Sequence, residues 1–237
     1  MGCDIHLYVE QRKNGQWRAL DNFVTEDAGT EFQYVTVPYK ERLYSGRSYN
    51  LFAILADVRN GRGFAGIKTG EGFNPISEPR GVPNDASPEY KHQVEEAGRD
   101  GHSHSYHTLR QLLDYDWTQT TVLSGWVSAA EWVKWSWYDR GQGEGPENYS
   151  GRIYGAMIEH LTPAQMDAIF DEAEKHDYQA RLALAEQHPH KYAQAEWTEP
   201  YYRAASNFLA DTIPRLLKLA GGVEGAEDIR IVFFFDN

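Results

Sequence analysis

The final apolar run of the chain constrains its fold more than any other feature. Residues 229–235 read Ile-Arg-Ile-Val-Phe-Phe-Phe, with a single charged side chain among seven. Successive side chains of a β-strand point to opposite faces, so a segment this apolar must be covered on both sides. The run therefore predicts a buried strand inside a sheet and argues against an exposed edge strand.

The first segment shows the alternation of a strand with one polar face. Four apolar residues would share one face: Cys3, Ile5, Leu7 and Val9. Four polar residues would share the other: Asp4, His6, Tyr8 and Glu10. The dipeptide Asn14-Gly15 predicts a tight hairpin turn after this strand. If the first and last strands are neighbours, Asp236 would lie near Asp4.

The segments between the terminal strands predict helices and one long loop. Leu51, Phe52 and Leu55 have helical spacing, and residues 32–37 suggest a further strand. Residues 60–101 are rich in Gly and Pro, which predicts a loop or lid over a site. The later half is expected to be mainly helical, with helix starts at Ser128, Thr162 and Thr198. The fold class is therefore α+β: a mixed or antiparallel sheet covered by helices, in a single domain spanning 1–237.

Composition restricts the environment and the partners. Apolar residues make up 41% of the 237, so a disordered chain is excluded. The net charge of -12 argues against binding of duplex nucleic acid, although a few arginines can still form a pocket for a small anion. The single cysteine, Cys3, excludes an internal disulfide and is expected to be buried filler. No signal peptide or membrane span is visible, so we expect a cytoplasmic protein without a membrane partner; homo-oligomers remain compatible with the sequence.

Asp4 and His6 form the first candidate site. Two residues apart on a strand, their side chains leave the same face about 6–7 Å apart. A carboxylate and an imidazole at that spacing could converge on one ion, one water or one phosphate. The alternative is an ordinary solvated strand face.

The second candidate site is the histidine cluster that starts at Asp100. Asp100, His102 and His104 lie within five residues, and imidazoles serve as metal ligands, proton carriers or phosphate contacts near neutral pH. His107 is the weakest member. Ser105 or Thr108 would cap the helix that follows. Some clustering is expected by chance, because the chain contains nine histidines.

Two chemistries fit these clusters if folding unites them. Asp4, His6, Asp100 and His102 have the ligand types of a zinc, manganese or magnesium hydrolase, with His104 as a further catalytic candidate. The other chemistry is metal-free, with one imidazole as base, another as acid, and arginines binding phosphate. The arginines proposed for this role are Arg47, Arg59 and Arg80. Each could instead be solvated or paired with an acid such as Asp57.

Four motifs together resemble a little-characterised family carried by bacteriophages and some bacteria. They are Met1-Gly2-Cys3-Asp4-Ile5-His6, Tyr49-Asn50-Leu51-Phe52 with Val58-Arg59-Asn60, Pro79-Arg80-Gly81-Val82-Pro83, and Asp100-Gly101-His102-Ser103-His104-Ser105. The resemblance covers about the first half of the chain. It implies a phage accessory protein, a class that includes proteins which destroy or sequester nucleotide immune signals. Four further residues in or beside these motifs are candidate ligand contacts: Tyr49, Asn60, Ser103 and Ser105.

Three functions follow as hypotheses. The first is a phosphodiesterase-like hydrolase of a small phosphate-containing molecule, such as a cyclic nucleotide immune signal, with aromatic rings stacking the base. The second is a non-catalytic nucleotide-binding sponge. The third is an acidic interaction protein or nucleic-acid mimic, which requires a continuous stripe of acidic residues.

Overall fold

The computed structural model describes residues 2–27, 33–138, 145–171 and 177–236. These residues form helices together with antiparallel and mixed sheets, which confirms the predicted α+β class. The chain divides into two compact units. The first comprises residues 1–60, 74–116 and 205–237, and the second comprises residues 61–73 and 117–204. A single domain was expected over residues 1–237.

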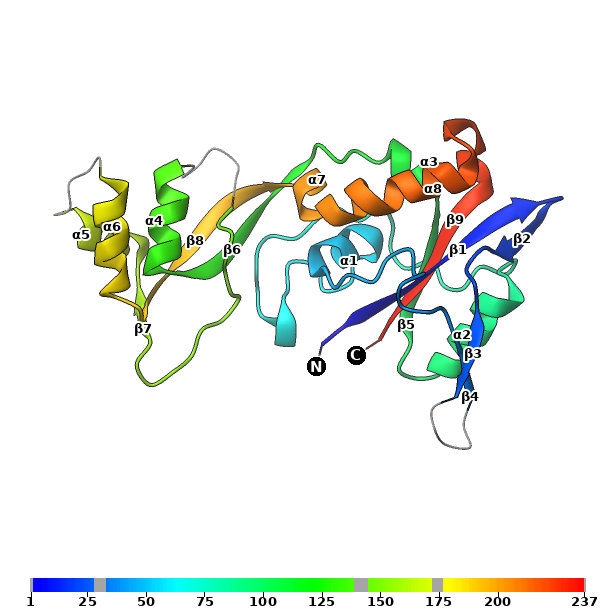
Figure 1. Cartoon of the computed structure of the whole chain (residues 1–237), viewed down its shortest axis with the longest axis horizontal. Coiled ribbons are helices and arrows are strands. Elements are labelled where there is room, and N and C mark those ends of the chain that lie inside the picture. The colour runs from blue at the N-terminus through cyan, green and yellow to red at the C-terminus, as the bar shows by residue number, and fades with distance from the viewer. Residues whose placement is uncertain (1, 28–32, 139–144, 172–176, 237) are drawn as a thin grey trace. The chain divides into compact units, whose positions relative to one another are not determined.

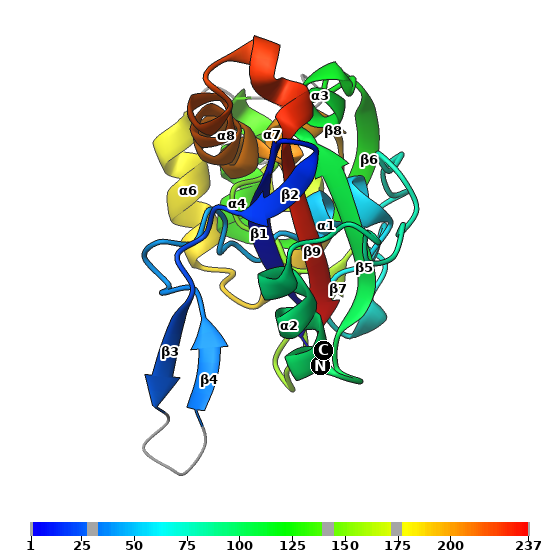
Figure 2. The ribbon, with the colours of Figure 1, turned by 90° about the vertical axis from the view of Figure 1, so that its right-hand side faces the viewer.

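The first unit is built on a four-stranded antiparallel sheet with the order β2-β1-β9-β5 (Figures 1 and 2). Its strands are β1 (Asp4–Lys13), β2 (Gln16–Ala19), β9 (Ile229–Asp236) and β5 (His102–Thr108). The predicted neighbours are confirmed, because β1 pairs with β9 in a register that sets Asp4 opposite Asp236. The apolar run is the central strand β9, and all its residues except Asp236 are buried.

Local turn chemistry explains the hairpin between β1 and β2. Asn14 and Gly15 both have positive φ, at 51° and 78°, as a two-residue hairpin turn of the predicted kind requires. A second hairpin, β3 (Val24–Asp27) with β4 (Gln33–Thr36), stands apart from the main sheet. β4 corresponds to the strand expected at 32–37, of which Phe32 lies outside the described residues.

Helices cover both faces of the main sheet. Those of the first unit are α1 (Tyr49–Ala56), α2 (Pro88–Ala97), α3 (Leu109–Asp114), the π-helical η2 (Phe208–Thr212), α8 (Ile213–Ala220) and the 3-10 segment η3 (Val223–Asp228). Phe52 of α1 packs against Phe235, whereas Tyr90 of α2 packs against Phe234. Adjacent residues of a strand point to opposite faces. We therefore call the two sides of the sheet the α1 face and the α2 face; Figures 1 and 2 show these helices on opposite sides of β9.

The segment expected to be a loop over residues 60–101 contains a helix. Ser87 caps α2 by accepting a hydrogen bond from the backbone N–H of Tyr90, and Pro88 follows at the first helical position. The density of Gly and Pro before residue 88 obscured this helix in the sequence. Residues 61–73, which include the short η1 (Phe64–Gly66), belong to the second unit, so the segment is divided between the two units.

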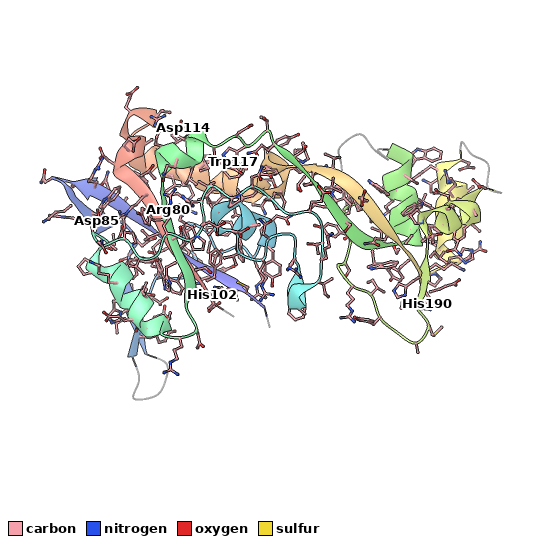
Figure 3. The ribbon with its side chains drawn as sticks, turned by 180° about the vertical axis from the view of Figure 1, so that it is seen from behind. Arg80, Asp85, His102, Asp114, Trp117 and His190 are labelled. Atoms are coloured by element: carbon pink, nitrogen blue, oxygen red, sulfur yellow. The ribbon has the colours of Figure 1, made fainter. Side chains whose placement is uncertain are left out.

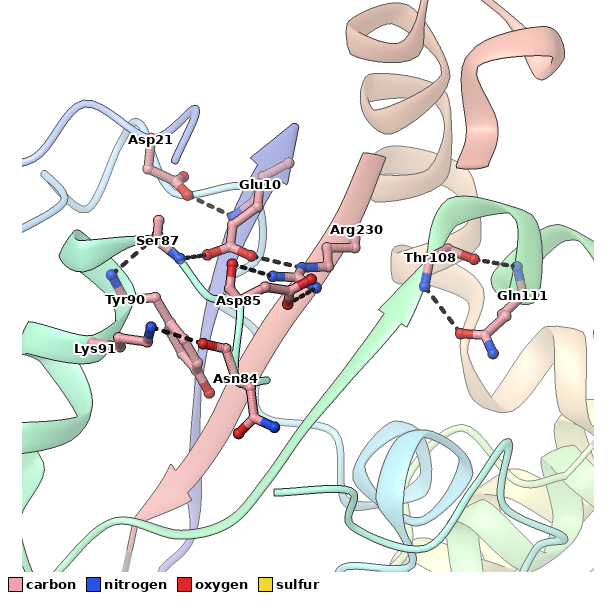
Figure 4. Close-up of polar contacts among 11 residues, drawn as sticks. Glu10, Asp21, Asn84, Asp85, Ser87, Tyr90, Lys91, Thr108, Gln111 and Arg230 are labelled. Atoms are coloured by element: carbon pink, nitrogen blue, oxygen red, sulfur yellow. Dashed lines mark hydrogen bonds and ion pairs between the residues drawn. The ribbon is translucent and has the colours of Figure 1, made fainter. Parts of the chain in front are cut away.

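A buried ion pair holds the start of α2 against the sheet (Figure 4). Nε of Arg230 donates to Glu10 Oε2 at 2.6 Å, and Glu10 Oε1 accepts the backbone N–H of Ser87 at 2.7 Å. Arg230 also donates to Asp85 at 2.9 Å and lies 4.0 Å from the ring of Trp17. With side-chain exposures of 4% and 0%, Arg230 and Glu10 are desolvated and depend on each other.

The second unit contains a sheet, which the expectation of a mainly helical later half did not include. It contains a mixed sheet of β6 (Thr120–Ser128), β8 (Lys191–Pro200) and β7 (Glu159–Leu161), with the order β6-β8-β7. Its helices are α4 (Ala129–Tyr138), α5 (Pro163–Phe170), α6 (Tyr178–Glu186) and α7 (Tyr201–Ala204).

Individual helix starts in the later half have different outcomes. Thr162 caps α5 in a capping box with Gln165, and Ser128 Oγ accepts the backbone N–H of Glu131 at the start of α4, as predicted. Thr198 does not cap a helix, because it lies in β8, where buried and exposed residues alternate. Its pairing with Val122 of β6 overrides the local cap signal. In the described part of the chain, no helix is both long and apolar enough to cross a bilayer.

Candidate functional site

His6 and Asp236 form a hydrogen-bonded dyad on the α2 face. His6 lies opposite Phe234 in the β1–β9 register, so Asp236 is its diagonal neighbour on the same face. His6 Nε2 lies 2.9 Å from Asp236 Oδ2. Both side chains are about one-third exposed, at 34% and 37%, so a small molecule can reach them. A carboxylate that accepts one imidazole N–H fixes the tautomer and leaves the other nitrogen as a base.

The ring of Phe234 separates His6 from His104. His6 stacks on this ring at a centroid distance of 4.7 Å, and His104 lies 5.4 Å from it. The two imidazoles belong to β1 and β5, with β9 between them. Adjacent strands of a sheet lie about 4.8 Å apart, so β1 and β5, with β9 between them, are roughly 10 Å apart. The ring of Phe234 therefore lies between the two imidazoles.

His104 is a partly buried member of this row. Its Nε2 atom is buried and has no hydrogen-bond partner among the described residues. Burial, followed by the neighbouring His102, lowers the pKa of His104 below its usual value. A neutral imidazole at this position suits packing on Phe234 better than proton transfer with His6.

A pocket of about 310 Å³ opens beside the dyad. It is lined by residues of β1, β4, α2 and β9 and of the loops that flank them: His6, Tyr8, Tyr34, Val35, Thr36, Arg42, Gln93, Glu96, Ala97, Asp100, Phe234 and Asp236. Of the predicted catalytic residues, it contains His6 and Asp100. Three carboxylates, those of Glu96, Asp100 and Asp236, line this pocket together with the guanidinium-bearing Arg42. We call this the dyad pocket.

Asp4 and Arg47 pair with each other. Arg47 Nε donates to Asp4 Oδ1 at 2.5 Å, and its Nη2 donates to Asp4 Oδ2. The hydrogen bond from Arg47 is the main reason that the pKa of Asp4 is lowered. The sequence analysis assigned Asp4 to catalysis or metal binding and Arg47 to phosphate binding. Their mutual pairing leaves each charge already compensated.

A β-bulge places His102 on the opposite side of the sheet. The register of β5 against β9 shifts between His102 and Ser105, and His102 stands opposite Phe235, on the α1 face. The ring of His102 stacks on Phe235 at 6.2 Å. Asp4 and His6 lie on the α2 face, so the four-residue metal set of the sequence analysis is not assembled. Within the described ranges, no group of three or more His, Cys, Asp or Glu side chains is arranged to hold a metal ion.

His102 lines a second pocket, of about 450 Å³, at the C-terminal end of α1 (His102 is labelled in Figure 3). Its lining is Ala56, Asp57, Val58, Arg59, Glu78, Pro79, His102 and Ser103. We call this the bulge pocket. It contains three of the predicted site residues, namely Arg59, His102 and Ser103. The predicted residues are therefore divided between two faces of one sheet.

The remaining candidates have structural contacts. Arg80 donates to the Tyr106 carbonyl and to Gln111 Oε1, and its backbone N–H donates to the buried Ser105 hydroxyl (Arg80 is labelled in Figure 3). The Tyr49 hydroxyl accepts the backbone N–H of Cys3 at 3.3 Å, and Asn60 donates to Asp57 at 2.6 Å. Cys3 is buried, as expected.

Two residues that line the dyad pocket had no clear signal in the sequence. Arg42 lies in the dyad pocket, with its Nε donating to the Val37 carbonyl at 3.1 Å, but nothing in its local sequence distinguishes it from other loop arginines. Asp236 was expected near Asp4 but not as the partner of His6. The available signal was that a polar residue, Asp236, ends the apolar run of β9.

No protein-family model, curated protein or solved structure matches this chain.

Proposed function

We propose that the chain is a metal-independent hydrolase of small phosphodiesters, with its reaction centre in the dyad pocket. The observation that carries the proposal is the 2.9 Å contact between His6 and Asp236 at the wall of a pocket. Histidine is the side chain best suited to proton transfer near neutral pH, and a carboxylate that orients it is a recurring arrangement in hydrolases.

His6 would act as the general base. When Asp236 accepts the N–H at Nε2, the lone pair at Nδ1 can take a proton from water, which then attacks phosphorus. Asp236 stabilises the imidazolium that results. Asp100 lines the same pocket and is the candidate general acid: it gives its proton to the leaving oxygen and regains one from the His6 imidazolium through water. General acid–base catalysis of this type contributes roughly 10²–10⁴-fold to the rate.

The charge of the pocket favours a phosphate group that carries a single negative charge. Glu96, Asp100 and Asp236 would repel the dianion of a phosphomonoester or the charges of a triphosphate, whereas a phosphodiester carries only one. Arg42 would contact that phosphate, because it is the arginine of the lining. Tyr34, 42% exposed, would stack a nucleobase.

Cyclic nucleotides satisfy these requirements and agree with the resemblance to a phage-carried family. A cyclic mono- or dinucleotide has one charge per diester and one or more bases to stack. The proposal thus includes cleavage of a cyclic nucleotide immune signal. A non-catalytic sponge would use Arg42 and Tyr34 in the same way but would leave the diester intact.

The test is hydrolysis of a panel of cyclic mononucleotides, cyclic dinucleotides and phosphomonoesters, with chelator present and again with Mg²⁺, Mn²⁺ or Zn²⁺. We expect cleavage of a diester in chelator and its loss in His6→Gln, with His104→Gln as the matched imidazole control. Recovery of unchanged ligand from heat-denatured protein would establish sequestration instead. Cleavage that requires a metal, or neither cleavage nor binding, would overturn the proposal.

The acidic-mimic hypothesis is disfavoured by the pairing of acidic side chains. Asp4, Glu10, Asp228, Glu159 and Asp114 each pair with an arginine or lysine. Such pairs interrupt the continuous negative stripe that a mimic of nucleic acid needs.

A further inference from the structure

The bulge pocket is separate from the dyad pocket, and its lining combines a nucleophile, a base and a cation. It lies on the α1 face, and none of its lining residues is shared with the dyad pocket. Ser103, His102 and Arg59 provide the hydroxyl, the imidazole and the guanidinium. A volume of about 450 Å³ is in the range of small-molecule sites.

The backbone around this pocket is held in unusual conformations. Among the described residues, five that are not glycine have positive φ, and three of them line this pocket: Asp57 at 57°, Arg59 at 56° and Ser103 at 50°. Asp57 is explained by its position as the C-cap of α1. Ser103 has a different cause, because it lies within the β-bulge, where one residue of the strand often takes a left-handed conformation. Left-handed conformations are costly for residues with a side chain, and they recur where a side chain must be aimed at a reaction centre.

The strained residue carries the hydroxyl that contacts the imidazole. Ser103 Oγ lies 3.0 Å from His102 Nδ1, which is within hydrogen-bond distance of a nucleophile and its base. The His102 ring is in turn oriented by stacking on Phe235, with 28° between the ring planes. The bulge thus determines both the direction of the hydroxyl and the face on which the imidazole lies.

We propose that the bulge pocket is a second reactive site, in which Ser103 is the nucleophile, His102 is the general base and the substrate is a small carboxylic ester. Asp57 and Glu78 in the lining disfavour a phosphate dianion, whereas a neutral ester enters without that repulsion. Arg59, whose Nη2 donates to the Gly2 carbonyl at 3.3 Å, is the cation of the lining that would stabilise the negative charge on the carbonyl oxygen.

The reaction proceeds in two balanced steps. Ser103 Oγ attacks the carbonyl carbon while its proton passes to His102 Nδ1. The ester C–O bond breaks, and the alcohol leaves with that proton. Water then attacks the acyl-serine and gives one proton to His102. The acid is released when the C–Oγ bond breaks and Ser103 regains the proton.

The test is covalent labelling with a fluorophosphonate probe, located by peptide mass spectrometry, together with p-nitrophenyl acetate hydrolysis. We expect an adduct at Ser103, no adduct in Ser103→Ala, and labelling at least about 10-fold slower in His102→Gln. The exposed Ser45 supplies the matched control, because Ser45→Ala should label at the parent rate. Circular dichroism would confirm that each variant is folded.

Absence of an adduct at Ser103 in the folded parent would overturn the proposal, and so would a labelling rate that His102→Gln leaves unchanged. The readout is an adduct at one serine and not cleavage of a phosphodiester. Its failure is therefore distinguishable from failure of the function proposed for the dyad pocket.

Discussion

The two faces of the main sheet place neighbouring residues of the same strands beside different pockets. Phe234 points to the α2 face, between His6 and His104, while Phe235 points to the α1 face, beside His102. The side chains beside the dyad pocket and beside the bulge pocket are therefore contacted by consecutive residues of β9, Phe234 and Phe235. In β5, the bulge decides on which face of the sheet each histidine lies. Clustering in the sequence therefore does not establish clustering in a site when the cluster lies on a strand.

The largest effect is expected from the imidazoles of the α2 face. His6→Gln should lower kcat/KM for a phosphodiester by about 10²–10⁴-fold, because it removes the general base. His104→Gln should lower kcat/KM by less than about 3-fold, because His104 packs on Phe234 and takes no part in the proposed proton transfer. Steady-state kinetics of both variants provide the measurement. Equal losses would show that the row of rings acts as one unit and would contradict the separation of the two histidines.

The opposite end of the α2 face should respond in stability and not in chemistry. Arg230→Met leaves Glu10 buried without its partner, so the free energy of unfolding should fall by about 3–5 kcal/mol. Arg12→Met, which breaks an exposed pair with Asp228, should change it by less than about 1 kcal/mol. Urea unfolding of the two variants tests this. Similar changes in both would mean that burial does not distinguish the pairs.

On the α1 face, His107 should make the protein sensitive to acid. Burial lowers the pKa of His107 to about 4, and its Nε2 contacts the Leu55 carbonyl at 2.7 Å. As the pH falls, His107 is protonated in the unfolded chain before it is protonated in the folded protein. The contribution of neutral His107 to the free energy of unfolding is therefore fully present above about pH 6.5 and is lost as the pH falls toward 4. The loss should reach about 3 kcal/mol. His107→Gln should flatten the dependence in urea unfolding from pH 7 to 4; an unchanged slope would refute the assignment.

Asp21 should have a smaller effect on stability than His107, with the opposite dependence on pH. Burial raises the pKa of Asp21 to about 6, despite the 2.6 Å hydrogen bond that its carboxylate accepts from the Val9 backbone N–H. As the pH rises, Asp21 keeps its proton longer in the folded protein than in the unfolded chain. The contribution of protonated Asp21 to the free energy of unfolding is therefore present below about pH 4 and is lost as the pH rises through 6.

Asp21→Asn should therefore stabilise the protein at pH 7 by about 1–2 kcal/mol, because the neutral amide oxygen still accepts the bond. Thermal unfolding at pH 7 and at pH 4 gives the comparison. A variant that is less stable than the parent at both values would contradict the raised pKa.

Terminal strands and helix caps were predictable because their signals are local. The apolar run at 229–235 required a covered strand, Asn14-Gly15 required a tight turn, and Thr162 required a helix start; each was confirmed. Thr198 carried a similar cap signal and was wrong, because strand pairing between β6 and β8 outweighs a local cap. The helix α2 was missed among glycines and prolines.

The candidate site was predictable only in part, for a physical reason. Alternation correctly placed Asp4 and His6 on one face, and the adjacency of the terminal strands correctly placed Asp236 near them. The bulge at Ser103 shifts the alternation of β5, and no residue type in His102-Ser103-His104 announces it. Which charges neutralise each other, as Arg47 and Asp4 do, depends on contacts between segments far apart in the sequence.

Asp4 and Asp236 offer the most direct test of the dyad, because they are cross-strand partners with similar exposure and different contacts. The measurement is kcat/KM for one cleaved phosphodiester in Asp236→Asn and in Asp4→Asn. We predict a loss of about 10-fold or more for Asp236→Asn, which weakens the orientation of His6, and less than about 2-fold for Asp4→Asn. Equal losses in the two variants, or a larger loss in Asp4→Asn, would contradict a reaction centred on His6 and Asp236.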